Sequence, residues 1–290
     1  MTAILKSRAP AFALLRLGRV SNIPTVWTNV IAAATLAGGS LDSRIATLLA
    51  AMSAFYVAGM YLNDFFDRRI DTLERADRPI PTGEIGAVAV AAIGFGLLAA
   101  GIVLLAPFGL LTMGWGAALA AVIVLYDLWH KRNPFSPLIM GMCRALVYAV
   151  TAVAMFNEAS GAILVAAIAL TCHVAGLTYA AKQEHINRVG SLWPLLMLAV
   201  PIAVCLPALA VGIEVPLALL LLVCVDVLAL RLLVKRPAKA VPTAVGMLIA
   251  AICLVDATVV ARAGGGLALT AACALAYPLT RMLQRVVPGT

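Results

Sequence analysis

Long apolar segments alternate with short polar segments along the whole chain, and their lengths set the predicted elements. Each apolar segment is near the ~20 residues that a helix needs to cross a bilayer. The segments lie at about residues 23–37, 45–66, 85–106, 108–126, 137–156, 162–181, 192–211, 215–234, 240–260 and 267–283. The pattern predicts an all-α fold, a polytopic transmembrane helical bundle of nine to ten spans, formed by one domain over residues 1–290.

Two polar segments have features of their own. Residues 1–21 are basic with apolar residues between, which predicts an interfacial segment that leads into the membrane. Residues 67–84 are rich in charge and end in Pro79 and Pro81, which lack amide donors and favour an extended chain. We expect residues 67–84 to form a loop that caps the bundle.

Composition supports a membrane protein. The chain is 63% hydrophobic and 12% charged, with a mean hydropathy of +1.04, whereas soluble domains are about half apolar and about a quarter charged. The net charge of +8 does not indicate a nucleic-acid partner, because no basic stripe is interleaved with aromatic residues. With a cytoplasmic N-terminus, only Arg44 and Arg262 fall in outer loops, which predicts that the charged loops face the cytoplasm.

The strongest candidate site lies at the end of the second apolar segment. Asn63, Asp67 and Asp71 are spaced i, i+4 and i+8, so on a helix they drift only ~40° and lie ~6 Å apart along the axis. Oxygen ligands in such a row suit Mg²⁺, which takes one or two carboxylates together with substrate phosphates. The alternative is an ordinary solvated helix end, but acids so close to membrane depth are costly unless they serve a function.

A resemblance to a known family rests on two neighbouring motifs. The pattern N-D-x-x-D-x-x-x-D over residues 63–71, followed by D-R-P-I-P-T-G over residues 77–83, resembles the first signature of the UbiA superfamily of intramembrane prenyltransferases. The resemblance implies a helical bundle around a central cavity with a cytoplasmic cap. Such proteins bind a prenyl diphosphate through Mg²⁺ and transfer the prenyl group to a small acceptor, often aromatic.

The resemblance assigns roles residue by residue. Asn63, Asp67 and Asp71 would hold Mg²⁺ on the diphosphate, Asp64 would support them, and Arg78 would meet a phosphate. The five residues that follow Arg78, through Gly83, would close the site from above; their alternative is an ordinary turn.

A second element is the stretch from Tyr126 to Arg132, which resembles the family's tyrosine followed by Lys-Arg. Lys131 would meet the diphosphate, with Tyr126 and Arg132 in support. The alternative is a basic loop that obeys the positive-inside rule, which applies to Arg132 as well as to Lys131.

The stretch after residue 181 departs from the family pattern, which has a second acidic motif there. Only Glu184 and Asn187 could serve a metal, and Lys182 places a cation where a carboxylate is expected. Either Lys182 neutralises phosphate charge directly or the protein has lost prenyl transfer. We favour the first hypothesis because the first motif is complete.

One cation lies inside an apolar segment. The sequence Gly141-Met-Cys-Arg144, together with the altered second motif, resembles the EboC-type branch of the superfamily, which implies a role in secondary metabolite biosynthesis. Arg144 itself is an intramembrane cation that we expect to contact either the diphosphate or an acid such as Asp226 or Asp256.

The leading hypothesis is a Mg²⁺-dependent membrane prenyltransferase, which we expect in a bacterial inner membrane. Its partners would be a prenyl diphosphate, a small acceptor expected to be aromatic, and the lipid bilayer. Two alternatives remain open. One is a lipid or small-molecule transporter on the same scaffold, and the other is an enzyme that ionises the diphosphate without an acceptor.

Overall fold

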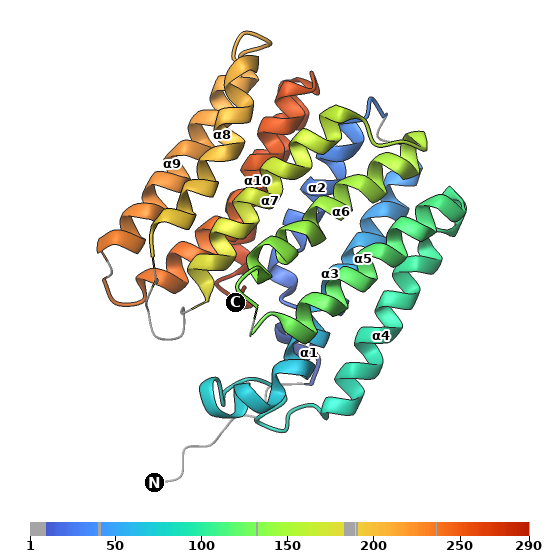
Figure 1. Cartoon of the computed structure of the whole chain (residues 1–290), viewed down its shortest axis with the longest axis vertical. Coiled ribbons are helices and arrows are strands. Elements are labelled where there is room, and N and C mark those ends of the chain that lie inside the picture. Colours follow the sequence, from blue (N-terminus) through green and yellow to red (C-terminus); the bar gives the residue numbers. More distant parts are fainter. Residues whose placement is uncertain are drawn as a thin grey trace.

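The computed structural model describes residues 10–39, 42–131, 133–182, 189, 191–235 and 237–289, and all regular structure in these ranges is helical. Figure 1 shows the long helices side by side in one bundle. The α-helices, long and short, are α1 (Pro10–Leu17), α2 (Ile23–Leu36), α3 (Ser43–Glu74), α4 (Ala87–Leu104), α5 (Leu110–Trp129), α6 (Ser136–Phe156), α7 (Gly161–Ala181), α8 (Ala199–Cys205), α9 (Glu214–Lys235), α10 (Ala240–Arg262) and α11 (Gly266–Leu283). The predicted all-α fold is confirmed.

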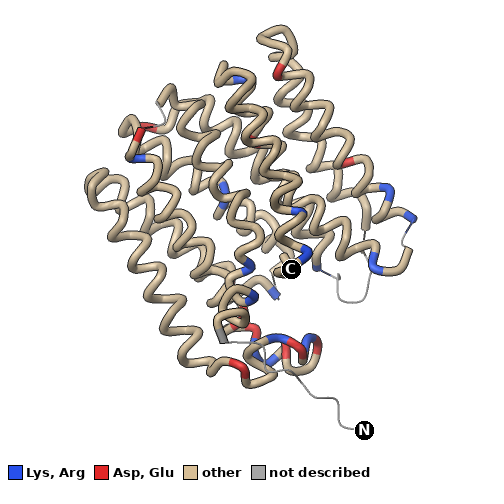
Figure 2. The backbone as a smooth tube through the Cα atoms, turned by 180° about the vertical axis from the view of Figure 1, so that it is seen from behind, with Lys and Arg blue, Asp and Glu red and all other residues tan. Residues whose placement is uncertain are grey.

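Eight helices in the described part of the chain are long and apolar enough to cross a membrane: α3, α4, α5, α6, α7, α9, α10 and α11. Two shorter apolar segments, α2 and Trp193–Ala208, complete the predicted set. Figure 2 shows charged residues sparse along the helix middles and gathered at the helix ends. The predicted nine to ten spans agree approximately with this arrangement.

Two elements differ from the sequence-based prediction. Helix α3 continues to Glu74, so the prediction of a loop over residues 67–84 is wrong for its first part. The helix continues there because Asp67 and Asp71 are buried against neighbouring side chains rather than solvated. The predicted span over residues 192–211 is broken into 3₁₀ and α pieces, because its three prolines interrupt the backbone hydrogen bonds: Pro194, Pro201 and Pro207.

The bundle has two apolar cores that meet at α2. One core is built mainly from α7, α9 and α10, and it includes Ala32 and Ala33 of α2. The other is built mainly from α3, α5 and α6, and it includes Val26 and Val30 of α2. Helix α10 is buried over most of its length and is rich in alanine, which permits close approach of neighbouring helices. The two halves meet through α2, which contributes to both cores, and through the packing of α6 against α7.

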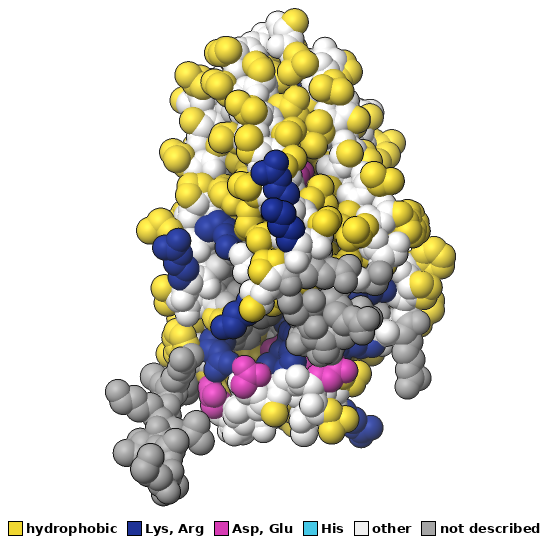
Figure 3. All heavy atoms as spheres, turned by 90° about the vertical axis from the view of Figure 1, so that its left-hand side faces the viewer, with side chains coloured by type: hydrophobic (Ala, Val, Ile, Leu, Met, Phe, Trp, Pro, Cys, Tyr) yellow, Lys and Arg dark blue, Asp and Glu magenta, His cyan; other side chains and the backbone are white. Residues whose placement is uncertain are grey.

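Helix α1 holds the segment that follows α3. Arg16 donates a hydrogen bond to the Asp77 carbonyl at 3.0 Å and lies 3.6 Å from the Glu84 carboxylate. Leu17 packs with Tyr61 and Val90 in a small apolar cluster that Ile80 and Ile85 border. Figure 3, which views the side of the molecule on which α9 lies, shows most acidic side chains on the lower part and basic side chains from the middle downwards.

Candidate active site

A cavity of about 450 Å³ lies between the two halves of the bundle. Its walls come from α3, α5 and α6 on one side and from α7 and α10 on the other. The charged residues among the described lining are mostly basic, with only two acids: Arg19, Arg75, Arg78, Lys131, Arg144 and Lys182, and Asp67 and Glu74. Such a cavity attracts a polyanionic ligand.

Two members of the predicted row face this cavity. The Asn63 amide nitrogen donates to the Asp127 carboxylate at 3.1 Å, which leaves its carbonyl oxygen as the atom available to a metal. The Asp67 carboxylate lies 3.2 Å from His130 Nε2 and 3.7 Å from Lys131 Nζ. Asn63 and Asp67 are one helical turn apart, so both oxygens can approach one ion.

The other two acids of the motif are bound by one arginine. Arg78 donates to the Asp64 carboxylate at 2.9 Å and to the Asp71 carboxylate at 2.6 Å, and Arg19 also reaches Asp64 at 3.1 Å. Positions seven apart on a helix lie within ~20° of each other, so one cation can bridge both carboxylates. Neither acid belongs to the described cavity lining, in contrast to Asn63 and Asp67.

The residues present fit a magnesium ion at Asn63 and Asp67. The described residues hold no group of three or more His, Cys, Asp or Glu side chains that could bind a metal by themselves. Mg²⁺, however, usually keeps several waters and takes one or two protein oxygens with substrate phosphates. Asp127 adds a third oxygen source, because its buried Oδ2 atom has no hydrogen-bond partner among the described residues.

The predicted basic residues lie around the same space. Lys131 Nζ is 3.7 Å from both the Asp67 and the Glu74 carboxylates. Lys182 is exposed but donates to the Asn133 carbonyl at 3.3 Å, and partial desolvation lowers the pKa of its ammonium group below the usual value. The Tyr126 ring stacks on the His130 ring with centroids 4.9 Å apart. Three predicted site residues lie outside the described residues: Arg132, Glu184 and Asn187.

The loop after α3 contributes differently from the prediction. Arg75 and Arg78 line the cavity, whereas the turn from Pro79 to Gly83 is absent from the described lining. Gly83 has a positive φ of 75°, which lets the chain turn back towards α4. The turn therefore serves to place Arg78 and to pack Ile80 against α1.

Sequence reasoning missed Asp127, His130 and Arg19, which all contact the acidic motif. Asp127 and His130 were assigned to a loop, but α5 continues through Trp129, so Asp127 lies on its last turn and His130 is its C-cap. A signal was present in the sequence, since Asp127 and Lys131 are spaced i, i+4, as are Tyr126 and His130. Arg19 gave no comparable signal within its basic segment.

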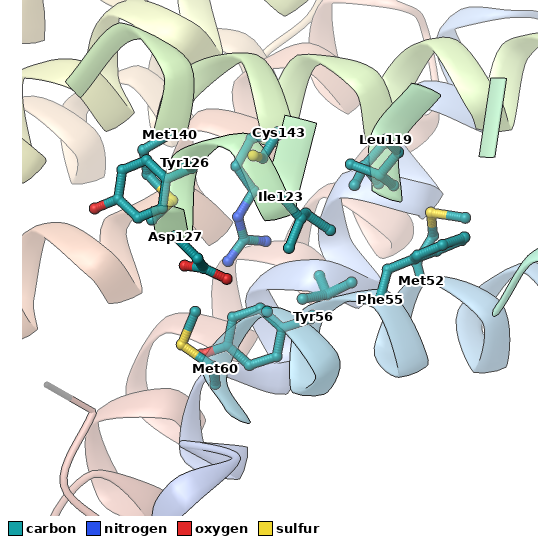
Figure 4. Close-up of a pocket in the computed structure, with 14 residues that line it drawn as sticks. Met52, Phe55, Tyr56, Met60, Leu119, Ile123, Tyr126, Asp127, Met140 and Cys143 are labelled. Atoms are coloured by element: carbon teal, nitrogen blue, oxygen red, sulfur yellow. The ribbon is translucent and has the colours of Figure 1, made fainter. Parts of the chain in front are cut away.

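A second, apolar pocket of about 80 Å³ opens beside the cavity. Figure 4 shows Tyr56 and Met60 of α3 on one side and Tyr126 and Asp127 of α5 on the other. Five residues line both this pocket and the larger cavity, so the two spaces adjoin: Tyr56, Met60, Tyr126, Met140 and Arg144. The pocket extends between Phe55 and Leu119 into the bundle.

Buried polar groups surround Arg144 beneath the cavity. Arg144 donates to the Asn29 side-chain oxygen at 2.8 Å and to the Thr25 hydroxyl at 3.0 Å. Asp256 accepts from the Asn29 amide and from Tyr148 at 2.7 Å. Of the two acids predicted as partners of Arg144, Asp256 is thus linked through Asn29. Both oxygens of Asp226 are buried without a hydrogen-bond partner among the described residues.

The fold and the site together define a class: a multi-pass helical membrane protein with an internal, mainly basic cavity next to a row of acids. The model of the UbiA prenyltransferase family matches residues 22–240 of the chain. The protein belongs to that family, and the resemblance seen in the sequence is confirmed. The similarity to the EboC-type branch stays a prediction.

Named relatives support the same family membership. A digeranylgeranylglyceryl phosphate synthase of Methanoregula boonei is 34% identical over 117 residues, which cover 40% of this chain and 42% of the relative. The synthase of the same name from Ignicoccus hospitalis is 40% identical over 116 residues, covering 39% of this chain and 37% of the relative. The chain thus matches about two fifths of the length of these relatives.

Solved structures share the fold. A UbiA homologue from Aeropyrum pernix K1 aligns with a TM-score of 0.68 and 19% identity, over 84% of this chain and 97% of that one. A UbiA homologue from Archaeoglobus fulgidus, bound to GPP and Mg²⁺, aligns with a TM-score of 0.61 and 16% identity, over 87% and 99% of the two chains.

Proposed function

We propose that the protein transfers a prenyl group from a prenyl diphosphate to a small acceptor within the membrane, with Mg²⁺ as cofactor. The observation that carries this proposal is that Asn63 and Asp67 share one cavity with Lys131 and Lys182. Family membership supports the reaction class, and the homologue bound to GPP and Mg²⁺ supports the donor and the metal.

In this proposal each residue acts on the diphosphate. The Asn63 carbonyl oxygen and the Asp67 carboxylate would hold Mg²⁺, which supplies electrostatic stabilisation to the departing diphosphate. Lys131 and Lys182 would contact the phosphate oxygens directly. The Asp67–His130 contact orients the carboxylate, since the two side chains are 3.2 Å apart. The apolar walls at Phe55 and Leu119 exclude water from the prenyl carbon.

The class of acceptor and the membrane in which the protein resides are proposed on less evidence than the reaction class. The sequence predicts an aromatic acceptor, while the named relatives are synthases of a glyceryl phosphate lipid. Both acceptor classes therefore belong in the assay. The predicted role in secondary metabolism and the predicted bacterial inner membrane stay predictions, since the named relatives are archaeal. We propose that the cavity end of the bundle faces the cytoplasm, because basic residues gather there.

The test is incubation of the purified protein in lipid nanodiscs with labelled geranyl, farnesyl or geranylgeranyl diphosphate, Mg²⁺ and each acceptor class. The expected result is a labelled prenylated acceptor that requires both Mg²⁺ and the acceptor. Labelled prenyl alcohol or a cyclised product that forms equally without an acceptor would instead identify an ionising enzyme. Binding of the diphosphate without any product, under all conditions, would favour a transporter or binding protein.

We expect Lys182→Ala to raise the KM for the diphosphate by about 10-fold, because a hydrogen bond to a charged group is lost. Partial desolvation lowers the pKa of Lys182, so diphosphate binding by the wild type should weaken as the pH rises through that pKa. The variant should lack this alkaline loss. Lys182→Asp should instead raise the Mg²⁺ concentration needed for half-maximal binding.

The matched control for Lys182 is Lys235→Ala, which removes a cation at the end of α9 outside the described cavity lining. Titration of diphosphate binding against pH and Mg²⁺ compares the variants. If Lys182→Ala and Lys235→Ala bind the diphosphate equally well, Lys182 does not contact the phosphates and only contributes to the membrane topology.

A further inference from the structure

We propose that Arg144 binds an anionic group of the acceptor, a phosphate or a carboxylate, in a subsite separate from the one that holds the donor diphosphate. The inference rests on the proposed transferase function and names the class of acceptor that this site would take. It assigns Arg144 to the acceptor rather than to the diphosphate.

The position of the Arg144 guanidinium is fixed by three neighbours. It donates to Asn29 and Thr25 of α2, and it lies over the Tyr56 ring with 5.4 Å to the centroid. Gly141 lies one turn earlier on α6, where an added Cβ would come within 2.7 Å of the Thr171 carbonyl oxygen. The glycine thus lets α6 lie directly against α7. The side chain is 9% exposed, and this small exposed part lines both the large cavity and the apolar pocket.

The charge of Arg144 is left without a direct anion. Its two hydrogen bonds among the described residues go to a neutral amide and a neutral hydroxyl. Asp256 is held by Asn29, Thr28 and Tyr148, so Asn29 stands between this acid and the guanidinium. A guanidinium has five N–H donors, and these two bonds use only part of that capacity. Burying a cation is costly unless an anion meets it, and a ligand entering the cavity can do so.

Depth separates Arg144 from the proposed diphosphate position. Tyr56, on which Arg144 lies, precedes Asp67 by eleven residues on the same helix. At 1.5 Å per residue, the two positions are about 16 Å apart along the axis of α3. Asn63, the other proposed Mg²⁺ ligand, is seven residues from Tyr56, or about 10 Å along the same axis. A diphosphate held at Asn63, Asp67 and Lys131 would therefore lie at a different level of the cavity from Arg144. In this arrangement the reacting prenyl carbon would lie between these two levels, within reach of an acceptor held at Arg144.

The chemistry of the side chain selects the class of ligand. A planar guanidinium offers paired N–H donors that match the oxygens of a phosphate or a carboxylate, while its stacking on Tyr56 holds the plane in place. A neutral phenol or alcohol would gain little there and would leave the cation unpaired. The site should therefore discriminate between acceptors that differ only in this anionic group.

The test uses matched pairs of acceptors, each with and without the charge. One pair is geranylgeranylglyceryl phosphate and geranylgeranylglycerol, and the other is 4-hydroxybenzoate and 4-hydroxybenzamide. The wild type should bind the anionic member of at least one pair 10- to 100-fold more tightly than the neutral member, as expected of a charge-assisted hydrogen bond. The pair that shows the difference distinguishes a phosphate from a carboxylate.

In the variant Arg144→Met, affinity for the anionic member should fall by about 10- to 100-fold to that of the neutral member, whose affinity should not change. Arg144→Lys keeps the charge and should retain part of the preference. The matched control is Arg231→Met, which removes an exposed arginine of α9 outside the described cavity lining. Binding of the donor diphosphate should be unchanged in all three variants.

Three results would overturn the inference: equal affinity of the wild type for charged and neutral members of both pairs, equal losses for both members in Arg144→Met, or a loss confined to the donor diphosphate. Acceptor binding is measured without donor and without Mg²⁺. A protein that binds the anionic acceptor through Arg144 but transfers no prenyl group would therefore contradict the proposed function and leave this inference standing. Prenyl transfer without any preference for the anionic acceptors would support the proposed function and contradict this inference.

Discussion

Asp67→Asn is expected to lower the turnover number by about 10²- to 10³-fold, because it removes one electrostatic stabiliser of the departing diphosphate. The substitution keeps size and hydrogen bonding but removes the charge that a Mg²⁺ ligand needs. The fold should survive, since Lys131 is 39% exposed at its side chain and also contacts Glu74. Turnover at saturating substrate, with Mg²⁺ titrated, is the measurement.

Asp64→Asn is the matched control, because Asp64 lies next to the same helical turn but outside the described cavity lining. It contacts Arg19 and Arg78, and its loss should affect stability more than turnover. An equal fall of Mg²⁺-dependent turnover in Asp64→Asn and Asp67→Asn would contradict the separation of the cavity-facing Asn63 and Asp67 from Asp64 and Asp71. Full turnover in Asp67→Asn would contradict the proposed metal position.

Arg78→Met is expected to destabilise the protein by about 3–5 kcal/mol, because it leaves the Asp71 carboxylate buried without its cation. Asp71 is 1% exposed, and its bond to Arg78 is 2.6 Å long. Asp64 keeps Arg19 as a second partner, so most of the loss should come from Asp71. In thermal unfolding followed in detergent, a loss of this size lowers the melting temperature by roughly 6–20 °C.

The control for Arg78 is Arg44→Met, which breaks a 3.0 Å pair with Asp42 whose side chains are 50% and 38% exposed. An exposed pair contributes at most about 1 kcal/mol, so this variant should melt close to the wild type. The double variant Arg78→Met/Asp71→Asn removes both members of the buried pair and should recover much of the lost stability. Failure of the double variant to recover any stability would show that Arg78 acts through other contacts.

The membrane-spanning helices could be predicted from the sequence because bilayer thickness demands long, nearly uncharged segments. The end of α3 could not be predicted in the same way. A run with four charges between Asp67 and Asp71 resembles a solvated loop in composition, and only the contacts with Arg78, His130 and Lys131 bury it. The breaks in the helix over Trp193–Ala208 could have been predicted from the sequence, because prolines interrupt helical hydrogen bonds.

Within the site, local spacing predicted part of the geometry. The i, i+4 relation of Asn63 and Asp67 places both at the cavity. Periodicity within one helix could not show that Arg78 would bind Asp64 and Asp71 together, because that contact requires the chain to turn back after α3. Nor could it show that Asp256 would meet Asn29, which lies 227 residues earlier in the chain.

The contact between Asp256 and Asn29 has a consequence for the insertion of the chain into the membrane. The first apolar helix enters the membrane with Thr28 and Asn29 among its buried residues, and their carboxylate partner arrives only with α10. The cavity likewise needs walls from α10, so a nascent chain that has inserted only α2 to α9 cannot yet hold a ligand in the site described here. Ligand binding in this cavity therefore requires that α10 has been inserted, late in the synthesis of the chain.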